Sequence, residues 1–121
     1  MQRNVKFLLP LLASIFMACT SDSEDDLMET EEPNGPVTYN ANIRAIINSN
    51  CLNCHSDPTR NGAPFSLTNF QQVSTRAENG SLSRSINKQA GEAGAMPPGG
   101  RLPQTTIDLI DQWIDEGFLE Q

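Results

Sequence analysis

Three side chains that can hold a cofactor lie within five consecutive residues. Cys51 and Cys54 are separated by two residues, and His55, the only histidine in the chain, follows directly. Thiols three positions apart on one helical turn can point the same way and add to the two vinyl groups of one porphyrin, while the adjacent imidazole reaches the iron. The C-x-x-C-H spacing is typical of the attachment site of a c-type haem.

A haem that exchanges electrons needs a second axial ligand, for which methionine, histidine and lysine are the usual candidates. The chain has no second histidine, and Met1, Met17 and Met28 all precede the part that can fold as a domain. Met96 is therefore the predicted sixth ligand, in an irregular loop stiffened by two prolines directly after it. The alternative is that Met96 only fills space in the core, because methionine is an adaptable packing residue.

Other uses of a C-x-x-C pair fit this chain less well. A redox dithiol of the thioredoxin type would need a βαβ setting, and none is visible. A zinc site would need a second Cys/His pair to complete a tetrahedron. Nucleic acid is not expected as a partner, since residues 37–121 carry a net charge of −2 (six basic against eight acidic).

Residues 1–18 have the composition of a secretory signal peptide. Arg3 and Lys6 precede the apolar stretch 7–18, which is too short to span a bilayer. Residues 16–19, Phe-Met-Ala-Cys, resemble a bacterial lipobox, which implies that Cys19 is lipidated and anchors the mature protein in a membrane. The alternative is an ordinary signal peptide in which Cys19 is incidental.

The formal charge of −7 belongs mainly to the segment that follows. Residues 19–36 contain seven acidic and no basic residues, together with Ser, Pro and Gly. Such a composition cannot bury a core, so we expect an acidic, disordered tether between Cys19 and a single domain at 37–121. The tether also resembles the acidic export signal of surface lipoproteins in Bacteroidetes-type bacteria, although a linker that merely keeps the domain soluble is an equal alternative.

The apolar spacing in residues 37–121 predicts an all-α fold, a small bundle of about three to five helices, because no segment alternates long enough to form a strand. We expect helices from near Thr38 toward Cys51, over 67–77 and over 81–88. Asn79-Gly80 predicts a turn, and residues 91–100 predict an irregular loop. At about 85 residues one apolar core is marginal, and a covalent cofactor would add to it.

The last helix is predicted by four apolar residues on one face and by a glycine stop at Gly117. These apolar residues are Ile107, Ile110, Trp113 and Ile114. Asp115 and Glu116 lie at the negative end of this helix's dipole, a small cost for which the sequence offers no reason.

These features together resemble a class I type monohaem cytochrome c domain, near the group often found in Planctomycetes and Bacteroidetes. The resemblance covers roughly residues 38–118 and is carried by C-x-x-C-H, by the Met-Pro-Pro-Gly loop at 96–99 and by I-x-x-I-x-x-W-I-x-x-G at 107–117. It implies that the second ring N–H of His55 donates to a loop carbonyl, for which Pro58 and Pro64 are candidates.

The resemblance also implies which side chains surround the cofactor. The expected lining residues are Phe65, Leu67, Phe70, Leu82 and Ile86, although membership of the core predicts the same burial. We expect Trp113 to join the first and last helices rather than to relay electrons. Arg101 is expected to be a solvated surface arginine, with pairing to a haem propionate as the alternative.

The sequence thus predicts an exported, lipid-anchored electron-transfer protein with one haem c, ligated by His55 and Met96, on the periplasmic face of the outer membrane or on the cell surface. It is expected to meet redox partner proteins transiently and to convert no small-molecule substrate, so it is not an enzyme. The alternative is a five-coordinate or weakly ligated haem that acts as a gas sensor or a peroxidase-like site. A further possibility is a haem domain that chiefly docks a larger complex.

Overall fold

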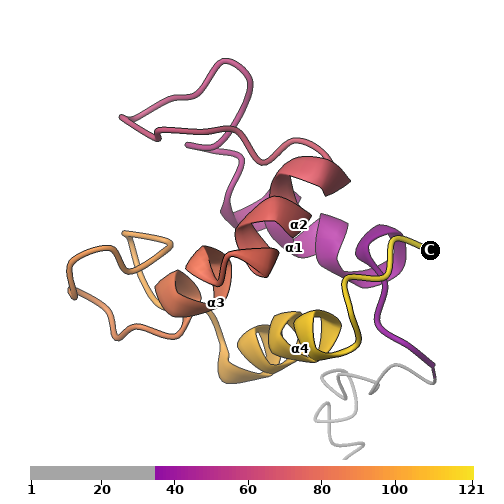
Figure 1. The fold of residues 1–121 in the computed structure, drawn as a ribbon. Coiled ribbons are helices and arrows are strands. Elements are labelled where there is room, and N and C mark those ends of the chain that lie inside the picture. The colour runs from indigo at the N-terminus through magenta and orange to yellow at the C-terminus, as the bar shows by residue number, and fades with distance from the viewer. Residues whose placement is uncertain (1–34) are drawn as a thin grey trace, which may run out of the picture. The chain divides into compact units, whose positions relative to one another are not determined.

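The computed structural model describes residues 35–121. The predicted signal peptide, Cys19 and residues 20–34 of the predicted tether lie outside the described residues. The described part contains a π-helical turn and four α-helices: η2 (Tyr39–Ile43), α1 (Arg44–Asn50), α2 (Phe70–Glu78), α3 (Ser81–Ile86) and α4 (Gln104–Asp115). It contains no strand, so the all-α prediction is confirmed for residues 35–121 (Figure 1).

The first helical segment begins where the sequence predicts. The Thr38 hydroxyl accepts the Ala41 N–H at 3.3 Å, while the Thr38 N–H donates to the Asn42 side chain at 3.0 Å. This reciprocal pair satisfies backbone groups that a helix start leaves free. η2 and α1 then run without interruption to Asn50, and Ile43 and Ile47 are buried.

The two middle helices are shorter than predicted, and side-chain hydrogen bonds explain their limits. The helix expected from residue 67 begins at Phe70, because the Asn69 side chain caps it by accepting the Gln72 N–H at 3.0 Å. The helix expected to reach residue 88 ends at Ile86, and Asn87 donates from its side chain to the Ser83 carbonyl at 3.1 Å. The predicted turn between them is present, with Gly80 at φ +73°.

α4 carries the predicted apolar face and ends at the predicted glycine. Ile107, Ile110 and Trp113 are buried, and Gly117 has φ +88°. The Gly117 N–H donates to the Ile114 carbonyl and the Phe118 N–H to the Trp113 carbonyl, both at 3.1 Å, which is a Schellman motif.

The acidic end of α4 has a role that the sequence does not reveal. Glu116 accepts the N–H of Val37 at 2.6 Å with one carboxylate oxygen and the side chain of Gln112 at 2.8 Å with the other. Val37 is fully buried, so its N–H has no access to water. The hydrogen bond from the Val37 N–H offsets the unfavourable position of the Glu116 carboxylate at the negative end of the helix dipole.

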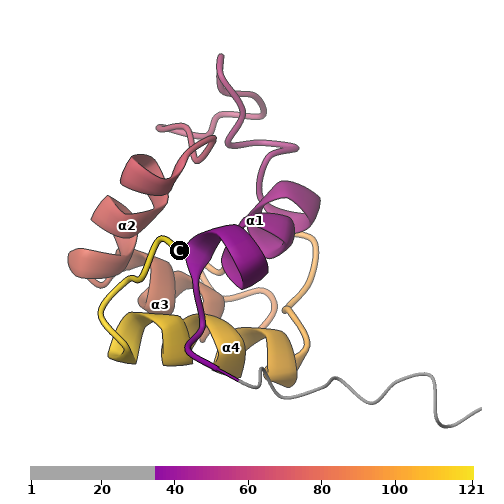
Figure 2. The same cartoon turned by 90° about the vertical axis from the view of Figure 1, so that its right-hand side faces the viewer.

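Trp113 of α4 packs against the first helical segment, as predicted. Its indole N–H donates to the Leu119 carbonyl at 2.9 Å, and its ring lies 6.2 Å from that of Tyr39 in η2. The Tyr39 N–H in turn donates to the Leu119 carbonyl at 2.8 Å. The C-terminal residues therefore lie beside the start of η2 (Figure 2).

The helices leave two long loops, 51–69 and 87–103, on the same side of the unit (Figure 1). η2 contacts α1 and α4, and α3 contacts both α2 and α4. This packing around the apolar core fixes the positions of α1 and α3, which precede the two loops. Within residues 35–121, no helix is long and apolar enough to cross a bilayer. The candidate site lies between the two loops.

Candidate functional site

The C-x-x-C-H motif forms a hydrogen-bonded turn directly after α1. The Cys51 N–H donates to the Ile47 carbonyl at 2.9 Å, and the His55 N–H donates to the Cys51 carbonyl at 2.9 Å. The second bond has the i to i−4 pattern of one helical turn. The backbone therefore presents the two cysteines and the histidine as one compact group.

His55 is held through both its ring and its backbone. Its imidazole Nδ1 lies 2.8 Å from the Phe65 carbonyl, and its own carbonyl accepts the Leu67 N–H at 2.8 Å. The Phe65 ring packs on the imidazole with centroids 4.7 Å apart. The acceptor at Nδ1 is thus Phe65, and the expectation of a carbonyl at Pro58 or Pro64 is wrong, because the Leu67 bond aligns residues 65–67 with His55.

The Phe65 contact determines which nitrogen of His55 is free. A carbonyl oxygen can only accept, so the 2.8 Å contact is a hydrogen bond when Nδ1 carries the proton. In the neutral imidazole the lone pair then belongs to Nε2. His55 is only 7% exposed, so this ring has little freedom to turn. The site therefore offers one buried nitrogen ligand with a defined tautomer.

The two cysteines carry free thiols in different surroundings. Burial raises the pKa of the Cys51 thiol to about 11, so Cys51 is protonated at neutral pH, whereas the attacking cysteine of a redox dithiol has a lowered pKa. The Asn61 side chain donates to the Cys54 sulfur at 3.4 Å. Within residues 35–121, no three His, Cys, Asp or Glu side chains are placed to share a metal ion.

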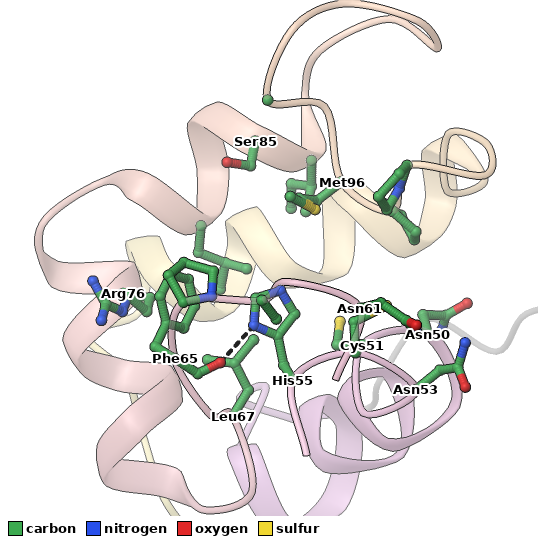
Figure 3. A pocket seen from close by; sticks show the side chains of 18 of the residues that line it. Asn50, Cys51, Asn53, His55, Asn61, Phe65, Leu67, Arg76, Ser85 and Met96 are labelled. Atoms are coloured by element: carbon green, nitrogen blue, oxygen red, sulfur yellow. Dashed lines mark hydrogen bonds between the residues drawn. The ribbon is translucent and has the colours of Figure 1, made fainter. Parts of the chain in front are cut away.

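Met96 approaches from the other loop. The Met96 N–H donates to the Ser85 carbonyl at 3.0 Å, which ties this position to α3. Its side chain is 37% exposed, so it is not a core-filling residue of the described part. In Figure 3, Met96 and His55 lie on opposite sides of a common space.

A cavity of about 770 Å³ brings the predicted residues together. Cys51, Cys54, His55 and Met96 all line it, and so do four of the five residues expected around a cofactor. These four are Phe65, Leu67, Leu82 and Ile86. The volume lies within the range of pockets for small molecules and cofactors, which are mostly apolar with a few polar groups.

Two of the sequence-based expectations lie elsewhere. Phe70 does not line the cavity, because its ring packs on Tyr39, with centroids 5.4 Å apart, and on Trp113. Arg101 also lies outside the cavity lining, and its guanidinium donates to the Gln104 side chain at 2.7 Å.

Arg76 is a site residue that the sequence reasoning missed. It lines the cavity from α2, and its guanidinium carbon lies 3.8 Å above the centre of the Phe65 ring. A charged residue in the last turn of a short helix has no distinctive pattern. The aromatic ring beneath it belongs to the loop before that helix, so only the fold reveals the contact.

The chain was compared with protein-family models, with curated proteins and with solved structures. None of the three comparisons found a match.

Proposed function

We propose that this chain carries a c-type haem and transfers single electrons, with His55 and Met96 as axial ligands and thioether bonds at Cys51 and Cys54. One observation carries the proposal: these four residues, from two loops far apart in the sequence, line the same cavity. Two thiols, an imidazole and a thioether are a donor set that fits this cofactor. The described part would then be a small cytochrome c-like bundle.

When bound, the haem would supply one-electron exchange between Fe(III) and Fe(II). The protein's own residues would set the conditions for it. His55 presents Nε2 because Phe65 holds its Nδ1 proton. Buried Leu67, Leu82 and Ile86 would exclude water from the cavity, and a dry pocket with a thioether ligand favours the reduced state.

The environment of Cys51 also supports covalent attachment. Its thiol is in an apolar setting that disfavours a negative charge. A thioether sulfur carries no charge, so attachment would place a neutral group there. This setting would suit attachment better than redox chemistry at the cysteine pair.

We further propose that residues 1–18 are a signal peptide and that Cys19 is lipidated, with residues 19–36 as a tether to the membrane. The protein would then be exported and held at the outer membrane, on its periplasmic face or at the cell surface. Its partners would be redox proteins that bind transiently, and it would convert no small-molecule substrate.

Spectroscopy of the haem-loaded full chain tests the ligand assignment. The oxidised wild-type protein should show the weak sulfur-to-iron absorption band, and Met96→Ala should lose it. The variant should also bind carbon monoxide rapidly in the reduced state, because an axial position is open. A wild-type spectrum without the band that Met96→Ala leaves unchanged would show that Met96 is not the ligand.

The second candidate is a five-coordinate or weakly ligated haem that acts as a gas sensor or a peroxidase-like site. The 37% exposure of Met96 favours it, because an exposed thioether is more easily displaced. This candidate predicts a high-spin spectrum and rapid carbon monoxide binding in the wild-type protein itself. The same measurements therefore separate the two functions.

A further inference from the structure

One charged side chain that lines the cavity has no role in the proposed function described so far. Among the described residues that line it, Arg76 is the one with a charged side chain at neutral pH; no Asp, Glu or Lys lines it. Arg76 is half-buried, and a guanidinium at the wall of a largely apolar cavity is stabilised when an anionic group pairs with it. Within residues 35–121 the Arg76 guanidinium has no hydrogen-bond partner, and its contact is the Phe65 ring.

The position of Arg76 indicates which part of a haem it would meet. In Figure 3, Cys51 and Arg76 lie on opposite sides of His55. A protohaem carries its vinyl groups on two adjacent pyrroles and its propionates on the other two. Thioether bonds at the cysteines would therefore direct the propionate edge away from Cys51, toward the Arg76 side.

The aromatic stack restrains the arginine. The Arg76 guanidinium lies over one face of Phe65, and that ring packs on His55 at an interplanar angle of 31°. Cation–π stacking suits a planar guanidinium and leaves its N–H groups available at the edge. A cation that is already restrained loses less conformational entropy when it binds an anion.

On the basis of the proposed function, we propose that Arg76 is a positioning residue that binds a haem propionate at the edge opposite the thioethers. Arg101, the candidate from the sequence, lies outside the cavity lining and donates to Gln104. Its Nε is buried and has no hydrogen-bond partner among the described residues, which makes Arg101 the rival. The two arginines therefore provide a matched pair for a test.

The experiment compares the full-length haem-loaded protein with Arg76→Gln, Arg76→Lys and Arg101→Gln. Covalent haem content, the propionate bending modes in resonance Raman spectra and the reduction potential are measured for each. Arg76→Gln should shift the propionate modes and lower the potential, because an unpaired propionate anion stabilises Fe(III). Arg76→Lys keeps the charge and should restore part of the potential, and Arg101→Gln should match the wild type.

Three results would overturn the assignment. The first is unchanged propionate modes and potential in a haem-loaded Arg76→Gln variant, even if its thermal stability falls. The second is a propionate shift in Arg101→Gln in place of Arg76→Gln. The third applies if Arg76→Gln fails to fold, and it is a set of propionate modes in Arg76→Lys identical to those of the wild type. Lysine lacks the planar, bidentate guanidinium, so a propionate bound by Arg76 should respond to this change. A wild-type chain without covalent haem would instead overturn the proposed function and this inference together.

Discussion

The two loops that line the cavity are held very differently. On the first loop, His55 is bonded through its ring to Phe65, through its carbonyl to Leu67 and through its N–H to Cys51, and it is 7% exposed. On the second loop, Met96 is tied to α3 by its N–H bond to Ser85, and its side chain is 37% exposed. The cavity thus combines a firmly positioned side with an adaptable one.

This difference indicates which part of the site is robust. A ligand that is held by several hydrogen bonds keeps its geometry when one contact is lost. A ligand on a loop with few ties to the core can open locally, at less cost than global unfolding. We therefore expect the two proposed haem ligands to respond differently to mutation and denaturant.

The largest expected effect is on the firm side. The double variant Cys51→Ala, Cys54→Ala should lose all covalent haem, because both proposed attachment points are removed. Haem that remains with the polypeptide after denaturing electrophoresis measures the loss. Asn53→Ala, an exposed residue between the two cysteines, is the control and should retain covalent haem. Covalent haem in the double variant would contradict the proposed attachment.

The second prediction compares the two sides in the unmodified, haem-loaded protein. In a guanidinium titration, the sulfur-to-iron absorption band should disappear before the fluorescence of Trp113 changes. Trp113 is the only tryptophan and is fully buried in the core, so its fluorescence reports global unfolding. The free energy of the step that removes the absorption band should also depend less on denaturant concentration than that of global unfolding, since opening one loop exposes little surface. Coincident transitions would show that Met96 is held as firmly as the core.

The third prediction concerns the acid–base behaviour of Cys51 in the haem-free chain. Its thiol should titrate with a pKa of about 11 in native buffer and near 9.0 in denaturant, because burial disfavours the thiolate. Below pH 9 the thiol is neutral in both states. As the pH rises from 9 to 11 only the unfolded state ionises, so stability should fall by up to about 3 kcal/mol.

Peptide-resolved alkylation at a series of pH values measures this pKa. The same chain in denaturant is the reference. If Cys51 titrates near 9 in native buffer as well, the haem-free chain does not form the apolar setting seen around this thiol.

The smallest expected effect is in the loop that follows the C-x-x-C-H turn. Asn61 has φ +51°, a left-handed conformation that costs alanine about 1 kcal/mol and glycine little. Asn61→Ala should therefore reduce the free energy of unfolding by about 1 kcal/mol relative to Asn61→Gly. Both variants lose the hydrogen bond to the Cys54 sulfur, so the pair isolates the backbone effect. Equal stabilities by denaturant titration would show that the first loop is not restrained at this residue.

Much of the helical framework could be predicted from local patterns. The Thr38 cap, the Asn79-Gly80 turn and the Gly117 stop each depend on residues close together in the chain, and the structure has all three. The start of α2 was predicted too early, at residue 67, because apolar periodicity alone includes Leu67. That residue is buried, but its N–H bonds to His55 and not to a helix.

The candidate site was predictable in its chemistry and less so in its contacts. The C-x-x-C-H spacing and the shortage of other histidines and methionines indicated Cys51, Cys54, His55 and Met96 as residues of one site. Phe65 as the hydrogen-bond partner of His55 and Arg76 as the charge on the cavity were not predicted. Both depend on how loop 51–69 folds back against α2, which no short-range pattern records.

The sequence by itself determined the chemical groups, their local spacing and the all-α character, because caps, turns and helical faces arise between residues a few positions apart. Tertiary structure decided what meets across the chain. It placed Met96 opposite His55, placed Phe70 against the core instead of on the cavity wall, and brought Arg76 rather than Arg101 to the cavity. These outcomes depend on packing between segments distant in sequence, and only the folded chain brings those segments together.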